Sequence, residues 1–258
     1  MNSQELILDI KDIKKDFGKN KVIKGVDLKI SKGEKVCIIG VNGGGKTTLV
    51  KIILGLYKQS SGTVDYPYYG DIKQFLKNTG VQFQDSTLPL NYTVNEVFNL
   101  VYGLSYKPKS IKEFKNWIKN DREVKKDEFL NFFSLNDKRK TKIKNLSGGQ
   151  KQRLNILLAL SLNPEVLILD ELTTGLDIKA KRTLLNYISD YQKNHDVTTI
   201  IVSHLIQEID TLADRIIFYD EGVIKSDMTI KEINKKYKSL EKYLDEIFIP
   251  TKNMEVES

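Results

Sequence analysis

The sequence predicts an α/β fold with a mostly parallel core sheet, an antiparallel β subdomain and an inserted helical subdomain. Two apolar runs, Val36–Ile39 and Val166–Leu169, have the continuous hydrophobicity of strands buried inside a parallel sheet. Two earlier segments, Leu6–Ile10 and Val22–Ile30, are rich in β-branched residues and partly alternate, which indicates antiparallel strands. Between the apolar runs, a lysine-rich helical pattern indicates the helical subdomain, at about residues 85–163.

The composition of the chain and the lengths of its apolar segments indicate its cellular compartment. Its 258 residues are 40% hydrophobic, which is enough to bury one large core. The longest apolar stretch, Leu154–Leu162, is far shorter than the ~20 residues that span a bilayer, and Met1–Glu5 does not resemble a signal peptide. We therefore expect a cytoplasmic protein. The single cysteine, Cys37, excludes an internal disulfide framework and is interpreted as a small buried hydrophobe.

The net charge of +7 raises the question of an anionic partner. Most lysines alternate with acids, as in Lys231–Lys236, which is typical of a solvated helix face. One basic cluster, Lys138–Lys144, contains no aromatic residue on which a base could stack. We therefore expect no nucleic-acid partner.

The first two strands are joined by a turn, Asp16–Asn20, that carries an aromatic residue. Upstream of a phosphate-binding loop, Phe17 can offer a flat face to adenine. On spacing alone, an ordinary core aromatic is about equally favoured.

A glycine-rich loop, Gly40–Thr48, follows Val36–Ile39 and precedes a helical stretch that ends near Gly55. Its pattern, G-x-x-x-x-G-K-[ST], lets backbone N–H groups turn inward around a polyphosphate with dihedrals that a Cβ would forbid. Lys46 is placed to contact the β- and γ-phosphates, and the Thr47 hydroxyl to ligate Mg²⁺. A glycine-rich turn without a ligand is the alternative, which the flanking strand and helix disfavour.

Two segments lead into the predicted helical subdomain. Gly80–Gln84 is predicted as a strand that ends at Gln84, where side chains of a parallel sheet meet a ligand crevice. Thr93–Glu96 fits a capping box at the start of an amphipathic helix. The later motif Leu146–Gln150 opens another helix, and its two glycines leave amides facing outward. We expect a second anion site there.

Two adjacent carboxylates, Asp170 and Glu171, end the second apolar run. Asp170 is placed to organise Mg²⁺, and Glu171 to accept a proton from the attacking water. An acidic helix start is the alternative interpretation, since acids favour that position. The phosphate loop earlier in the chain favours the catalytic interpretation of these two carboxylates.

The rest of the chain completes the sheet and adds a tail. Val197–Val202 is predicted as a strand, and His204 after it is placed to contact a γ-phosphate, although a lone histidine is usually structural. Arg215–Ile224 is predicted as a hairpin with a tight turn. Thr229–Phe248 is predicted as an amphipathic helix or helix pair.

Together these motifs resemble the nucleotide-binding subunit of the ATP-binding cassette (ABC) transporters, a family of P-loop NTPases, from Leu6 to about Lys225. Leu146–Gln150 matches the signature motif of that family, which other P-loop ATPases lack. The resemblance implies a single nucleotide-binding domain at residues 1–225, a short helical tail at 226–258, and ATP and Mg²⁺ as cofactors.

The resemblance also implies a role for each motif. The residues implied in catalysis are Lys46, Gln84, Glu171 and His204. The residues implied in Mg²⁺ binding are Thr47, Gln84 and Asp170. The residues implied in nucleotide binding are Phe17, Asn42, Gly43, Gly44, Gly45, Lys46, Thr47, Thr48, Ser147, Gly148, Gly149, Gln150 and, in the family's D-loop, Asp177.

The family further implies a head-to-tail dimer with a second nucleotide-binding domain, either an identical chain or a paralogue. In this dimer, Ser147 and Gly149 of one domain bind the γ-phosphate of ATP held by the other. The implied partner is a membrane permease on a separate polypeptide, which would hold the subunit at the cytoplasmic face of the membrane. Residues 80–84 and 90–96, together with Thr173–Asp177, look most like those of exporters of drugs, antibiotics or lipid-linked polymers, with an importer ATPase as the runner-up. A soluble ABC ATPase, such as one that assists iron–sulfur cluster assembly, is the alternative from another functional class.

Two positions depart from the family pattern. Gly44 stands where serine or another small residue is common, which gives three consecutive glycines and predicts a looser loop. Leu172 stands where the D-loop usually has proline. Neither change touches a group that contacts phosphate, so we expect an active ATPase.

Overall fold

The computed structural model describes residues 5–83, 88–105 and 122–248. The chain divides into two compact units. Unit 1 comprises Met1–Phe75 and Ile188–Ser258, and unit 2 comprises Leu76–Tyr187. Helices α2 (Ile72–Lys77) and α7 (Ile178–His195) contain residues of both units.

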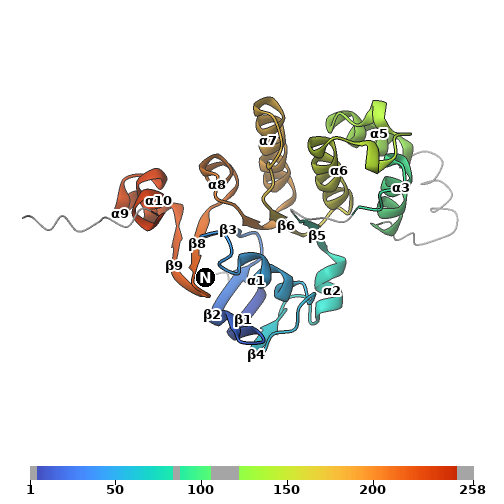
Figure 1. Ribbon diagram of the computed structural model, residues 1–258. Helices are drawn as coiled ribbons and strands as arrows, with labels where there is room; N and C mark the ends of the chain where they lie inside the picture. The colour runs from blue at the N-terminus through green and yellow to red at the C-terminus, as the bar shows by residue number, and fades with distance from the viewer. Residues whose placement is uncertain (1–4, 84–87, 106–121, 249–258) are drawn as a thin grey trace, which may run out of the picture. The chain divides into compact units, whose positions relative to one another are not determined.

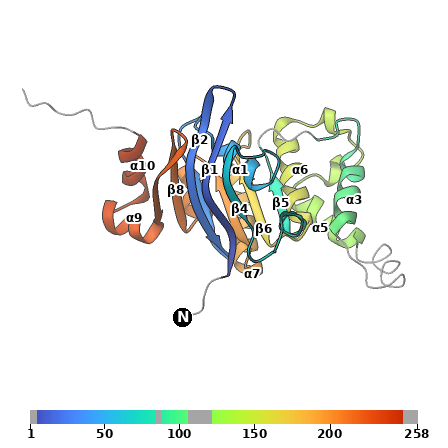
Figure 2. The ribbon, with the colours of Figure 1, turned by 90° about the horizontal axis from the view of Figure 1, so that it is seen from below.

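Unit 1 contains a three-stranded antiparallel sheet in the order β2–β1–β4 (Figure 2). Its strands are β1 (Leu6–Phe17), β2 (Asn20–Ser31) and β4 (Ser61–Asp65). The first two strands are longer than predicted because the pairing shifts register between Ile10 and Ile13 and then continues to the turn. Asp12 lies at this bulge with a φ of 43°, and its backbone N–H donates to Asp27 Oδ1 at 3.0 Å. A bulge interrupts the alternation that marks a strand in the sequence.

Four strands of unit 1 lie side by side in the order β7–β3–β8–β9. These strands are β7 (Thr198–Val202), β3 (Lys35–Ile39), β8 (Arg215–Asp220) and β9 (Val223–Thr229). Strand β3 pairs in parallel with β7 and β8, while β9 returns antiparallel to β8, which confirms the predicted hairpin. Cys37 in β3 is fully buried, and this burial raises the pKa of its thiol, as expected of a structural cysteine.

The helices wholly within unit 1 are α1 (Lys46–Ile53), α8 (Ile206–Leu212), α9 (Ile230–Tyr237) and α10 (Leu240–Phe248). Helix α1 buries its apolar face. The C-terminal segment forms a helix pair, because the chain turns at Lys238, whose φ is 71°. Thr229 and Glu232 form a capping box at the start of α9.

In unit 2, β5 (Thr79–Gln82) pairs in parallel with β6 (Val166–Asp170). The described residues of unit 2 form helices α3 (Val94–Ser105), α5 (Arg122–Phe132) and α6 (Gly148–Ser161), and two 3₁₀ turns, Asn136–Lys138 and Ile143–Asn145, lie between α5 and α6. Helix α6 packs against α3, α5 and β5 (Figure 1). Gly80 permits this approach, because a Cβ there would clash with the Ala159 carbonyl oxygen. The predicted capping box of Thr93 and Glu96 is present.

Strand β5 ends at Gln82, before the predicted end, and Gln84 lies outside the described residues. Within the described ranges, none of the helices combines the length and the apolar character that crossing a membrane requires. The predicted boundaries at residues 85, 163 and 225 stay predictions.

Candidate functional site

The phosphate loop of unit 1 connects the carboxyl end of β3 to the first residue of α1, Lys46. Gly45 is the N-cap residue, with a left-handed φ of 101° and no side-chain capping hydrogen bond. The first turn of α1 therefore relies on other groups to satisfy its backbone N–H donors. Such a helix end favours an anion, since the amides and the helix dipole both present positive charge.

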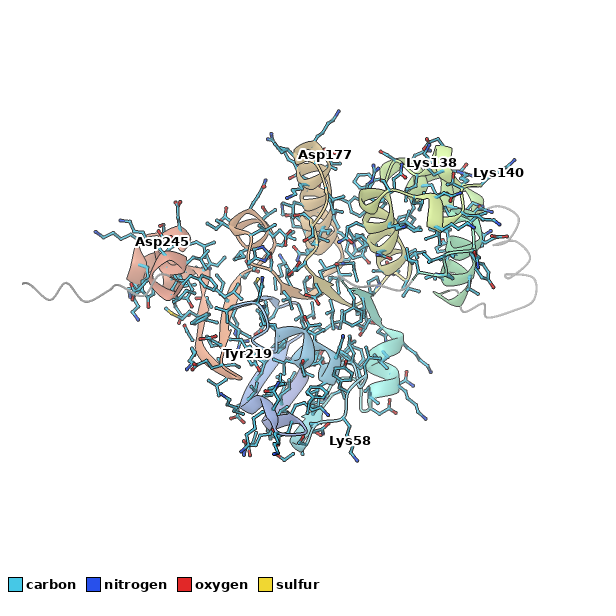
Figure 3. The ribbon with its side chains drawn as sticks, viewed as in Figure 1. Lys58, Lys138, Lys140, Asp177, Tyr219 and Asp245 are labelled. Carbon is cyan, nitrogen blue, oxygen red and sulfur yellow. The ribbon has the colours of Figure 1, made fainter. Side chains whose placement is uncertain are left out.

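Two glycines of the loop are required by sterics. A Cβ on Gly40, whose φ is 155°, would clash with the carbonyl oxygen of Tyr219 on β8, a residue labelled in Figure 3. A Cβ on Gly45 would lie 3.0 Å from Val22 Cγ1. The loop thus lies directly against β2 and β8, and only glycine allows this approach.

Lys46 folds back over its own loop. Its Nζ donates to the carbonyl oxygens of Gly40 at 2.9 Å and Val41 at 2.8 Å. The ammonium is therefore held above the loop, where a phosphate bound by the loop amides would meet it. Gly44 donates its backbone N–H to Val41 O at 3.2 Å, so a turn hydrogen bond closes the loop at the position predicted to loosen it.

Phe17, at the end of β1, is 46% exposed and is not a core aromatic. Its ring meets the ring of Tyr57 edge-on, with centroids 5.7 Å apart. Lys15 Nζ lies 4.7 Å from the Phe17 ring centroid and also donates to Lys58 O at 2.8 Å. The ring is thus held from two sides while part of it faces solvent. His204, also in unit 1, lies exposed just beyond the carboxyl end of β7.

The two carboxylates of unit 2 lie at the end of β6. Asp170 is its last residue and is 2% exposed, and its carbonyl oxygen accepts from Gln82 Nε2 at 3.1 Å. Glu171 follows with a φ of 52°, a left-handed conformation that is strained by ~1–3 kcal/mol in a residue other than glycine. Such strain persists where surrounding contacts enforce it and is common at catalytic positions.

Gln152 of α6 supplies such a contact, which the motif analysis missed. Its Nε2 donates to the carbonyl oxygens of Glu171 at 3.3 Å and Leu172 at 2.8 Å. Leu172 is fully buried, so the residue that replaces the usual proline is an apolar anchor. The sequence signal for this role was weak, because Gln152 stands among other polar residues, Gln150, Lys151 and Arg153, in the first turns of α6.

The signature motif forms the start of α6. Ser147 is the N-cap, its Oγ accepts from Gln150 N at 3.3 Å, and its own N–H donates to Gln150 Oε1 at 2.9 Å. Ser147 and Gly148 are exposed, and Gly149 approaches the carbonyl oxygen of Gly175, from which a Cβ would be 3.2 Å away. This end of α6 therefore carries the features of an anion site that the sequence predicted.

Asp177 lies at the start of α7 (Figure 3), where its Oδ1 accepts from Ala180 N at 2.9 Å. The carboxylate therefore caps the helix. Its predicted contact with nucleotide stays a prediction.

Within the described ranges, no group of three His, Cys, Asp or Glu side chains could hold a metal ion by itself. Mg²⁺ bound with a nucleotide needs few protein ligands, because phosphate and water oxygens complete its coordination. The Thr47 hydroxyl and the Asp170 carboxylate are hard oxygen donors and fit this requirement. Unit 1 thus carries Phe17, the phosphate loop and His204, whereas unit 2 carries the carboxylates and the signature motif.

The chain is similar to known proteins over most of its length. A sequence model of the ABC transporter family matches residues 23–174. Over 230 residues, the chain is 34% identical to a sulfate/thiosulfate import ATP-binding protein of Pectobacterium atrosepticum, covering 88% of this chain and 67% of the relative. It is 35% identical over 230 residues to a methionine import ATP-binding protein of Clostridium acetobutylicum, covering 85% of this chain and 68% of that relative. It is 31% identical over 222 residues to a linearmycin resistance ATP-binding protein of Bacillus subtilis, covering 84% and 67%.

Solved structures agree with the fold. The structure of an ATP-binding subunit of an ABC transporter has a TM-score of 0.78 at 23% identity, covering 93% of this chain and 98% of that chain. An ATP-binding cassette solved as a dimer, in a post-hydrolysis state with ADP and Pi, has a TM-score of 0.74 at 26% identity, covering 86% and 98%. Fold and phosphate loop define an α/β ATPase of the cassette type. The chain belongs to the ABC transporter family, as an ATP-binding subunit that hydrolyses ATP.

Proposed function

We propose that the chain dimerises head to tail around two ATP molecules and that their hydrolysis drives a separate membrane permease. The observation that carries this proposal is the exposed start of α6, where Ser147 and Gly148 present an anion-binding helix end to solvent. In a head-to-tail dimer, this end covers the ATP held by the phosphate loop of the partner. A similar cassette was solved as a dimer with ADP and Pi, which supports dimerisation.

Each residue then has a role in hydrolysis. Lys46 and the loop amides bind the β- and γ-phosphates, and Phe17 stacks on adenine. Thr47 and Asp170 hold Mg²⁺, which when bound neutralises charge on the phosphate oxygens. Glu171 accepts a proton from the attacking water, and His204 contacts the γ-phosphate. Through its permease, the subunit lies at the cytoplasmic face of the membrane.

The sequence pattern and the names of the relatives favour different directions of transport. Residues 80–84, 90–96 and 173–177 favour export, and one relative is named for linearmycin resistance. Relatives at 34% and 35% identity are named as import ATP-binding proteins, so we carry import as a second candidate. Purifying Glu171→Gln protein from detergent-solubilised membranes of its host, with ATP present, identifies the partner. A multi-spanning protein supports transport, and recovery of soluble proteins alone favours the non-transport ATPase.

Mixing two inactive variants tests the head-to-tail dimer. A Ser147→Arg chain retains its phosphate loop, and a Lys46→Ala chain retains its signature motif. Random assortment makes half of the dimers mixed, each with one intact site of two, so we expect about a quarter of the wild-type ATPase rate. Mixing Lys46→Ala with Glu171→Gln is the control. It stays inactive, because both residues serve the site of their own chain, and no recovery in the first mixture at any ratio contradicts the proposal.

A further inference from the structure

A cavity of about 260 Å³ lies within unit 2. It is formed where the end of α5, the side of α6 and the first turns of α7 meet. Its volume is below the ~300–1,000 Å³ of pockets that hold drug-sized ligands, so it suits an occupant with a single ring.

Part of the lining of this cavity is apolar and aromatic, and we call Phe132, Phe133 and Leu184 its aromatic wall. Phe133 is 3% exposed, Leu184 is buried, and Phe132 is 39% exposed. The rings of both phenylalanines contact Tyr187, with centroids 4.1 Å away for Phe132 and 5.7 Å away for Phe133. These contacts fix the wall, and a flat apolar group can stack against such rings.

The lining of the cavity also includes two cations, Arg153 and Lys179, and one carboxylate, Asp177. Arg153 Nε is buried and has no hydrogen-bond partner among the described residues. Nearby Asp137, whose pKa is lowered mainly by a hydrogen bond from Lys138 and slightly by Arg153, pairs with Lys138 at 2.9 Å. Asp177 already caps α7. A buried guanidinium N–H without an acceptor is costly, and an oxyanion would satisfy it.

We infer that this cavity is a binding site for a small aromatic oxyanion, such as a one-ring carboxylate. The ring stacks on Phe132 and Phe133, and the oxyanion accepts from Arg153 with Lys179 beside it. An occupant would touch α6, which begins at the signature motif, and α7, which begins at Asp177. It would therefore alter ATP-dependent dimerisation, a consequence that rests on the proposed function, whereas the binding itself does not.

The test measures binding of 4-fluorobenzoate to the full chain by ¹⁹F NMR without nucleotide. We expect saturable binding with a Kd of about 0.1–1 mM, which is usual for so few non-hydrogen atoms. The neutral analogue 4-fluorobenzyl alcohol should bind at least about tenfold more weakly, because it leaves Arg153 without an anionic acceptor.

Four variants locate the site. Arg153→Gln removes the cation, and Thr183→Trp fills the cavity from an exposed position on α7, so each should weaken binding about tenfold or more. Arg182→Gln, an exposed arginine one residue away on the same helix, should leave it unchanged, as should Lys46→Ala in the phosphate loop. If Arg153→Gln fails to fold, the effect of Thr183→Trp on 4-fluorobenzoate binding still tests the inference. The inference is overturned if 4-fluorobenzoate binding does not saturate below 10 mM or if the alcohol binds equally well. It is also overturned if Thr183→Trp leaves the binding of 4-fluorobenzoate unchanged or if Lys46→Ala abolishes it.

Discussion

The side-chain amide of Gln152 donates a hydrogen bond of 2.8 Å to the carbonyl oxygen of Leu172. The same amide reaches the carbonyl oxygen of Glu171, the residue held at a φ of 52°. Gln152 is 8% exposed, so water cannot easily replace it at these two carbonyls. The glutamine therefore positions the backbone that carries the proposed catalytic base.

We predict that Gln152→Met lowers kcat about tenfold and leaves ATP affinity nearly unchanged. Methionine keeps the volume and loses both donors, so Glu171 can relax from its strained conformation. Steady-state ATPase assays and nucleotide titration measure the two quantities.

A second buried glutamine provides the matched control. Gln192, which is 3% exposed, donates to Thr199 Oγ1 at 2.9 Å and to Leu212 O at 3.1 Å. Gln192→Met should lose a similar ~1–3 kcal/mol of stability in urea unfolding while keeping kcat. Equal kcat losses in the two variants would mean that Gln152 acts through stability alone.

Local patterns predicted the strand, loop and helix around Lys46, because glycine spacing and apolar periodicity act within a few residues. They could not predict the contact of Gln152 with Leu172, which joins positions 20 residues apart. They also favoured a helix start as the alternative for Glu171, since acids stabilise that position, whereas the fold holds it left-handed. The approach of Gly40 to Tyr219 likewise depends on the pairing of β3 with β8.

The aromatic platform in unit 1 gives a second prediction. Phe17→Ala should weaken ATP binding about tenfold, since base–aromatic stacking contributes ~1–3 kcal/mol. Lys15→Met should weaken it less, because Lys15 only holds the ring through its contact at 4.7 Å and its bond to Lys58 O. Lys58 is labelled in Figure 3. Fluorescence titration with a labelled nucleotide provides the affinities.

Inorganic tripolyphosphate separates base binding from phosphate binding in these variants. It has no base, so its affinity should be the same in wild type and Phe17→Ala. A parallel loss of tripolyphosphate affinity would show that the substitution disturbs the phosphate loop and would contradict the stacking role.

Gly40 should be intolerant of any side chain. A Cβ there clashes with the Tyr219 carbonyl oxygen, so Gly40→Ala must move the loop away from β8. We expect both a lower Tm and loss of ATP binding, measured by thermal unfolding with and without nucleotide. Gly18→Ala is the control, because Gly18 has a φ of 60° with no atom within 4 Å of the added Cβ, and only ~1–2 kcal/mol of backbone strain applies.

The capping box of α9 should make this helix sensitive to acid. Glu232 accepts from Thr229 N and from Thr229 Oγ1, both at 2.8 Å, and these hydrogen bonds lower the pKa of its carboxyl below the ordinary value. A carboxyl group whose pKa is lower in the folded chain than in the unfolded chain stabilises the folded state at pH values above its unfolded-state pKa. This stabilisation is lost as the pH falls through the folded-state pKa. Hydrogen exchange of the α9 amides should therefore show protection falling below about pH 4.

Glu232→Gln isolates the titrating group, because its amide can still accept from Thr229 but carries no charge. Protection of α9 in this variant should be lower than wild type at pH 7 and should change little between pH 5 and pH 3. Glu241→Gln, in the first turn of α10, should keep the wild-type profile of α9. An unchanged acid response in Glu232→Gln would assign the sensitivity of α9 to another carboxyl group, since only position 232 has lost its proton site.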